Sequence, residues 1–423
     1  MKTSNWRIPM LIVAMSLATA WAIRGQFGHE QGAAWAGGIG GLALVLVSQR
    51  RDWYRKMMLV ALASAVGWGA GGMISYGMVV GYGNADNFPN AFYGLGMLFV
   101  IGGLFGLLGG GLVGLTLDST RENRVKWGSL ITEMAVGGLI GYYFLVEQIG
   151  IKMTPPRSEA WAVCLGAGLA MLWHLARGKR NSAMRVAFFS MLGAGIGFGF
   201  GNFLQVMGKI GQVSFNMWNV MEYSIGFFGG LGMAYGVFSS KWPQDIPGPK
   251  KWENWSSYII VGLFIPLIVY RESLSFEHLV RRFKDLPNVA SLATTSTIVA
   301  AIILLMMMCL LYWKMKKERI EKKDVLHALF ILWIPYILVS YIVKGLFGGV
   351  MEITHHLYLL NVLIIIILGR IKNAPISFGD LDKVPVKKWI YLLMGAILFM
   401  AFLALLASSL HGDIGGHNRF PLD

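Results

Sequence analysis

The 423-residue sequence has few charged residues and almost no cysteine. Charged residues make up 14% of the chain and hydrophobic residues 55%, and the mean hydropathy is +0.57. A soluble chain of this length could not bury so much apolar surface, so a soluble globular protein is excluded. The two cysteines, Cys164 and Cys309, fall inside apolar segments. A disulfide between loops is therefore not expected, and redox chemistry is disfavoured.

The apolar residues are gathered in runs that repeatedly reach about 20 residues, the length that crosses a bilayer. Thirteen membrane helices are predicted, over 8–24, 32–48, 57–82, 91–116, 128–149, 159–176, 186–208, 217–239, 257–272, 291–313, 325–347, 353–369 and 389–410. The expected fold class is an all-α, multi-pass integral membrane protein.

The basic residues are distributed unevenly among the predicted loops. With the N-terminus inside, 27 of the 37 Lys and Arg residues lie in inner loops and 10 in outer loops, which is a positive-inside pattern. It predicts a cytoplasmic N-terminus, an outer C-terminus and a cell-membrane location, the inner membrane in a Gram-negative bacterium. The loops also account for the net charge of +15. The expected partner is therefore the lipid bilayer and not nucleic acid.

The first eight predicted helices resemble two copies of a four-helix unit. At a constant offset, Leu62 and Tyr93 match Leu192 and Tyr223. Six glycines match at the same offset, namely Gly67, Gly69, Gly71, Gly96, Gly102 and Gly106 with Gly197, Gly199, Gly201, Gly226, Gly232 and Gly236. Because each unit has an even number of helices, the duplication is predicted to be parallel.

This duplication divides the chain into predicted parts. The two repeats cover 1–118 and 119–240, and a cytoplasmic linker covers 241–256. A C-terminal five-helix part, 257–423, carries an outer amphipathic helix near 273–284 and a polar outer tail.

Two glycine-rich segments, 67–72 and 195–201, alternate glycine with larger residues. They lie inside predicted helices with no strand before them, which argues against a phosphate-binding loop. Close helix packing is the expected role. The alternative is a kinked or locally unwound helix that lines a cavity.

Nearly all candidate functional side chains fall on the predicted outer side of the helices. They are Arg24, His29, Glu30, Asp86, Glu147, Glu222, Glu352, His355, His356, His411, Asp413 and His417. Ionisable residues are costly within a membrane unless they serve a site. The distribution therefore indicates a site that opens to one aqueous compartment.

The candidate catalytic residues are Glu30, Glu147 and Glu222. Glu30 and Glu147 occupy equivalent repeat positions, so they are expected to face one another at similar depth. Arg24 and His29 have no equivalents in the second copy, so the two carboxylates have unlike surroundings, as acid/base catalysis requires. The alternative for the first outer turn is a solvated loop with an Arg24–Glu30 ion pair.

Residues expected to bind a polar substrate flank these carboxylates. They are Arg24, His29, Asp86, Asn219, Trp35 and Trp161. The two tryptophans are repeat equivalents below the outer loops, where their rings would flank a sugar.

A divalent metal is the alternative cofactor, whereas the paired-carboxylate mechanism requires none. Glu352, His355 and His356 share one helix face by their spacing, and His411 and Asp413 lie in the tail. There is no HExxH motif and no cysteine ligand nearby, so the pattern is a weak metal signal.

Three functions follow from these residues. The first is an outward-facing membrane enzyme, a hydrolase or transferase that acts on a glycosidic group from the outer side. The second is a transporter of a small polar solute, either a sugar or an anion. The third is an outward-facing metal-dependent hydrolase.

Overall fold

The computed structural model describes residues 5–244, 246–317, 319–371, 375–381, 383–412 and 414–421, and within them it contains helices and no strand. Eleven helices are long and apolar enough to cross a membrane, and a bent pair would make a twelfth. The prediction of a multi-pass helical membrane protein is confirmed at this level. The thirteen predicted segments lie largely on helix, although 57–82 is interrupted at 73–76 and 325–347 at 344–345. Helix α10 (Met217–Phe238) is not among these twelve.

Six helices form a closed ring in which each contacts the next and the last contacts the first. In ring order they are α1 (Arg7–Arg24), α2 (His29–Ser48), α4 (Met57–Gly72), α6 (Phe88–Leu117), α9 (Asn181–Ile210) and α10. The short helices α3 (Arg51–Tyr54) and α5 (Gly77–Gly83) flank α4.

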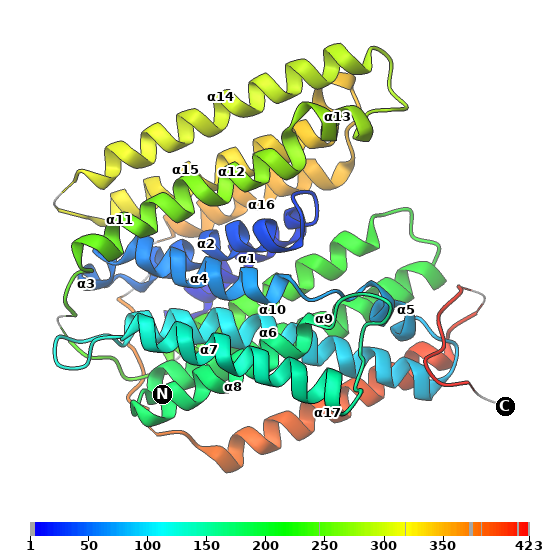
Figure 1. Ribbon diagram of the computed structural model, residues 1–423, viewed down its shortest axis with the longest axis horizontal. Helices are drawn as coiled ribbons and strands as arrows, with labels where there is room; N and C mark the ends of the chain where they lie inside the picture. The colour runs from blue at the N-terminus through cyan, green and yellow to red at the C-terminus, as the bar shows by residue number, and fades with distance from the viewer. Residues whose placement is uncertain are drawn as a thin grey trace.

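The remaining helices surround this ring (Figure 1). A hairpin packs on α6 and consists of α7 (Trp127–Tyr142), η2 (Tyr143–Gln148) and α8 (Ala160–Arg177). A second group reaches α1, α2 and α4, and consists of α11 (Lys251–Ile259), η3 (Ile260–Phe264), α12 (Ile265–Val269), η4 (Tyr270–Leu274), α13 (Phe276–Arg282), α14 (Val289–Met315), α15 (Lys322–Val343), η5 (Leu346–Gly348) and α16 (Ile353–Arg370).

The last helix, α17 (Val386–Ser409), packs on α6 and α9, at the other edge of the molecule from α14 (Figure 1). The residues predicted as one C-terminal part, 257–423, therefore lie on two sides of the ring. The predicted amphipathic segment contains the short helix α13, whose Leu279 is buried against α14.

The glycines of the two glycine-rich segments lie at close helix contacts. A Cβ on Gly71 would lie 2.7 Å from Phe105 Cα, and one on Gly197 would lie 2.5 Å from Ser224 O. The close-packing interpretation is therefore confirmed for both segments. The kink of the alternative is present at the first segment, because α4 ends at Gly72 and bends by 67° into α5, while the cavity that it would line stays a prediction. Helix α9 continues unbroken through the second segment.

Aromatic side chains fill the middle of the ring. The Trp21 ring centroid lies 5.0 Å from that of Trp68 and 5.4 Å from that of Phe105, which in turn lies 6.0 Å from Phe198. All four side chains are fully buried. They come from four helices of the ring, so their mutual contact packs its centre.

Aromatic and basic side chains pack together at one end of the bundle. At the end where α1, α4 and α9 begin, here called the basic end, Trp53 contacts Trp242 and Phe378 at ring distances of 5.4 Å each. The Arg50 guanidinium lies 4.5 Å from the Trp53 ring and donates a hydrogen bond to Pro243 O at 2.6 Å. These contacts join the turn after α2 to Trp242, Pro243 and Phe378. The other end, here called the opposite end, holds the candidate site.

Candidate functional site

A buried ion pair lies at the opposite end, between the last residue of α1 and the second turn of α10. Arg24 Nη2 donates to Glu222 Oε2 at 3.0 Å and to Tyr76 Oη at 2.7 Å. Tyr76 Oη donates to Glu222 Oε1 at 2.5 Å. The Arg24 and Glu222 side chains are 0% and 3% exposed. We call Arg24, Tyr76, Glu222 and the adjacent His29 the Arg24 cluster.

Helix packing explains why these side chains meet. A Cβ on Gly226 would lie 2.7 Å from Ala18 Cα, so α10 approaches α1 closely at that level. Glu222 precedes Gly226 by about one helical turn and therefore faces the end of α1. Tyr76 lies in the break between α4 and α5, where its ring packs on Phe198 at 5.0 Å.

The rim of the Arg24 cluster reaches the surface. His29 is exposed, and its Nδ1 lies 3.3 Å from Arg24 Nη1. Trp218 is 42% exposed and stacks on Tyr76 with ring centroids 6.1 Å apart. Arg24 Nε is buried and has no hydrogen-bond partner among the described residues. The cluster thus combines a desolvated ion pair, a spare donor and an accessible imidazole.

A second polar group lies beside the cluster, on the turn after α1. Gln26 Nε2 lies 3.3 Å from His355 Nε2, and Ser340 donates to Gln26 Oε1 at 2.9 Å. Asn219, a predicted substrate-binding residue, donates to Tyr358 Oη at 2.7 Å. These contacts link α1, α10, α15 and α16 around one end of the bundle.

The three predicted catalytic carboxylates have separate surroundings. Glu222 is buried with Arg24, whereas Glu30 and Glu147 are exposed. No hydrogen bond joins any two of the three in the described residues. The expected alternative of an Arg24–Glu30 ion pair is wrong, because Arg24 pairs with Glu222.

Both predicted sugar-flanking tryptophans are buried in helix contacts. Trp35 Nε1 donates to Leu332 O at 3.0 Å, and its ring packs on Tyr336 at 5.0 Å. Trp161 Nε1 donates to Glu159 Oε2 at 2.6 Å. Packing accounts for both rings, and their contact with a substrate remains a prediction.

The predicted tail residues meet α5 and the loop that follows it. His411 Nε2 lies 2.7 Å from Asn84 O, and His417 N donates to Gly81 O at 3.0 Å. Asp86 is exposed and lines a groove of about 390 Å³ together with His411. The tail thus folds back onto the bundle, where it contacts a loop of the first predicted repeat.

The predicted metal ligands do not come together. Within the described parts of the chain, no group of three or more His, Cys, Asp or Glu side chains could hold a metal ion. His355 contacts Gln26, while His356 Nδ1 lies 3.5 Å from Tyr341 Oη. His411 belongs to the tail contact described above, and Asp413 lies outside the described residues.

The predicted ligand Glu352 is exposed and has a partner of its own. Lys344 Nζ donates to Glu352 Oε1 at 3.1 Å. Although desolvation acts in the other direction, this contact with Lys344 lowers the pKa of Glu352. The carboxylate is therefore occupied by a lysine in this arrangement.

No protein-family model, curated protein or solved structure matches the chain.

Sequence reasoning missed two residues of this region, Tyr76 and Gln26. Tyr76 follows the glycine-rich run that ends at Gly72. A tyrosine just after such a run could have indicated a break in the helix with a hydroxyl group available for hydrogen bonding. Gln26 lies in a turn of charged and polar residues, where nothing in the local sequence indicates a contact with α15 or α16.

Proposed function

We propose that the chain is a membrane carrier for a small anionic solute, and that the Arg24 cluster is its binding centre. The observation that carries this proposal is the position of the buried Arg24–Glu222 pair at the break between α4 and α5. Ionisable residues within a membrane protein mark substrate and ion sites. Discontinuous helices line such sites in many carriers.

The charges of the cluster indicate how binding would proceed. Arg24 and Glu222 neutralise one another, and Arg24 Nε is a spare buried donor. An anionic solute that engages the guanidinium would displace the Glu222 carboxylate. An unpaired buried carboxylate is costly, so Glu222 would take up a proton as the solute binds. The proposal therefore includes proton-coupled movement of the anion.

The predicted topology completes this proposal. The positive-inside pattern would place the basic end in the cytoplasm and the Arg24 cluster on the outer side of a cell membrane. A parallel duplication is compatible with carriers, because some are built from parallel repeats. The proposed carrier function depends on the Arg24 cluster and does not require the duplication.

The test uses the protein reconstituted into liposomes that contain a pH-sensitive dye. Succinate, malate and gluconate are added outside in turn, with glucose as the neutral comparison. At least one anion is expected to acidify the lumen, and Glu222→Gln is expected to abolish that acidification. Glu133→Gln is the matched control, because Glu133 pairs with Arg177 and His174 on the peripheral hairpin. Acidification equal to that of protein-free liposomes, or unchanged in Glu222→Gln, would contradict the proposal.

The second candidate is the outward-facing enzyme that acts on a glycosidic group. It is favoured by the buried aromatic packing of Trp21 with Trp68 and Phe105 in the middle of the ring, which would separate the site from the basic end. Here Glu30 would act with Glu222 after these carboxylates approach one another, and Glu147 is the alternative partner of Glu30. Turnover of a labelled glycoside by detergent-solubilised protein, lost in Glu222→Gln, would support this enzyme against a carrier. Sensitivity of that turnover to a chelator would indicate the metal-dependent variant.

A further inference from the structure

An apolar groove of about 410 Å³ lies on the side of the bundle among α4, α6, α7, α11 and η3. Its lining includes Leu62, Val66, Leu112 and Ile131. Val66 is 49% exposed and Ile131 is 63% exposed, so the groove opens sideways. In a membrane protein that direction leads to lipid. The groove is therefore placed and lined to accept a hydrocarbon chain.

A basic pocket of about 550 Å³ lies at the basic end, around the loop between α6 and α7. Four cations line it, Arg121, Arg124, Lys126 and Lys250, against the two carboxylates Glu122 and Glu253. None of these four cations is in an ion pair among the residues that the structure describes. Their charges are therefore available to an anionic group.

The groove and the pocket are continuous. Trp127, Trp252 and Glu253 line both of them. Trp127 Nε1 donates to Glu253 Oε1 at 3.2 Å, which engages the one acidic side chain between the two. Tryptophan is typical of the interface between hydrocarbon and head groups. The basic pocket thus adjoins the apolar groove at the depth where a lipid changes from polar to apolar.

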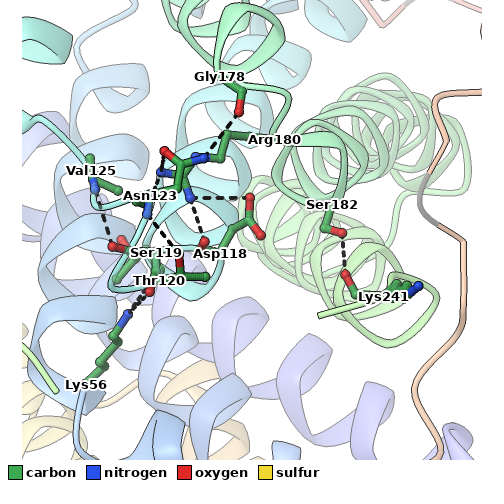
Figure 2. Close-up of polar contacts among 11 residues, drawn as sticks. Lys56, Asp118, Ser119, Thr120, Asn123, Val125, Gly178, Arg180, Ser182 and Lys241 are labelled. Carbon is green, nitrogen blue, oxygen red and sulfur yellow. Dashed lines mark hydrogen bonds and ion pairs between the residues drawn. The ribbon is translucent and has the colours of Figure 1, made fainter. Parts of the chain in front are cut away.

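The loop between α6 and α7, residues 118–126, is here called the basic loop. Two cations from other elements hold it in place (Figure 2). Lys56 Nζ donates to Ser119 O at 3.0 Å and to Thr116 O at 3.1 Å. Arg180 Nη1 donates to Asp118 O at 2.6 Å. Burial lowers the pKa of Lys56 to about 8. The side chains that line the pocket are thus presented by a loop that is fixed from both sides.

We propose that this surface binds one anionic phospholipid, with the head group on the basic loop and an acyl chain in the groove. Basic pockets between membrane helices on the cytoplasmic side recognise anionic lipid head groups. The charge of the pocket selects an anion. The apolar groove that continues from it selects a lipid over a free phosphate. This inference does not depend on the function of the Arg24 cluster.

The test is native mass spectrometry of the full chain in detergent, with phosphatidylglycerol and phosphatidylcholine of identical acyl chains as the probes. Phosphatidylglycerol is expected to give a one-to-one adduct that survives activation better than the phosphatidylcholine adduct. The triple variant Arg121→Gln/Arg124→Gln/Lys126→Gln is expected to weaken phosphatidylglycerol binding about tenfold or more. Equal retention of the two lipids by the native chain would overturn the proposal.

Two further variants separate this site from general lipid contact. Lys316→Gln/Lys387→Gln/Lys388→Gln removes the same charge from exposed positions elsewhere and is expected to retain the adduct. Val66→Trp fills the groove and is expected to weaken phosphatidylglycerol binding while the basic loop stays intact. Loss of the adduct in the control, or full retention in Val66→Trp, would overturn the proposal. Retention in Val66→Trp would also indicate that the head group alone is recognised.

Discussion

Arg24 and Glu222 are 198 residues apart in the chain, yet Arg24 Nη2 lies 3.0 Å from Glu222 Oε2, with both side chains buried. Removing two charges from water is costly, and mutual attraction offsets that cost when both partners are present. Removing one partner is therefore expected to lower the free energy of unfolding far more than replacing both partners with apolar residues.

Glu222→Gln is expected to lower the free energy of unfolding by about 3–5 kcal/mol, because it leaves the Arg24 charge buried and uncompensated. Denaturant unfolding in detergent measures this change. Glu133→Gln, in a partly exposed pair, is expected to cost about 1 kcal/mol or less. The double variant Arg24→Met/Glu222→Met should regain much of the loss. Equal losses in Glu222→Gln and Glu133→Gln would contradict the prediction.

Tyr76→Phe is expected to lower the free energy of unfolding by about 1–3 kcal/mol. The substitution removes the hydroxyl that donates to Glu222 and accepts from Arg24, so buried polar atoms lose a partner. The ring contacts with Phe198 and Trp218 should remain. Thermal unfolding of the two proteins side by side measures the effect. An unchanged melting temperature would show that the hydroxyl contributes nothing to stability.

Gly226→Ala is expected to destabilise the protein by about 1–3 kcal/mol, because the new Cβ would meet the backbone of α1. Gly96→Ala is the matched control. Nothing lies within 4 Å of a Cβ at Gly96, and this glycine also lies within a helix. The control is expected to be neutral or to stabilise by about 0.5–1 kcal/mol through helix propensity. Equal melting temperatures for the two variants would contradict the close contact between α1 and α10.

The partly buried carboxyl group of Asp118 is expected to make the stability of the protein depend on pH. Burial raises the pKa of Asp118 to about 6, although Arg180 opposes this shift, while an unfolded aspartate titrates near 3.9. Between these values the folded state binds more protons than the unfolded state. The free energy of unfolding contributed by this group therefore falls as the pH rises from about 4 to 6.

The shift corresponds to roughly 3 kcal/mol. Comparison with Asp118→Asn isolates it, because the other titrating groups are common to both proteins. Relative to the variant, the native chain should lose stability across this pH range and then stay level. Melting curves of both proteins at several pH values test this, and parallel curves would contradict the assignment.

Much of the fold was predictable from local sequence. Runs of apolar residues long enough to cross a bilayer gave the helices, because a backbone in lipid must satisfy its hydrogen bonds internally. Thirteen membrane helices were predicted, whereas up to 12 helices are long and apolar enough to cross a membrane. The difference is α10, which carries Asn219, Glu222 and several glycines among its apolar residues. The division of 257–423 between two sides of the ring depends on helix packing and had no local signal.

The candidate site was predictable in part. Arg24, His29 and Glu222 were placed on one side of the membrane helices, and they meet in one cluster. The expectation that Glu30 would be the paired carboxylate rested on proximity in sequence and on the repeat. The structure instead selects Glu222, because the glycine-mediated contact between α1 and α10 brings that side chain to the end of α1.

The sequence by itself determined the membrane class, the helical segments and the side of the bundle on which the polar residues gather. Those properties follow from hydrophobicity, segment length and charge, which are local quantities. The tertiary structure decided which charge pairs with which, where α4 breaks, and which basic residues border an apolar groove. These depend on contacts between helices distant in the chain, where the absence of a single Cβ at a glycine sets how closely two backbones approach.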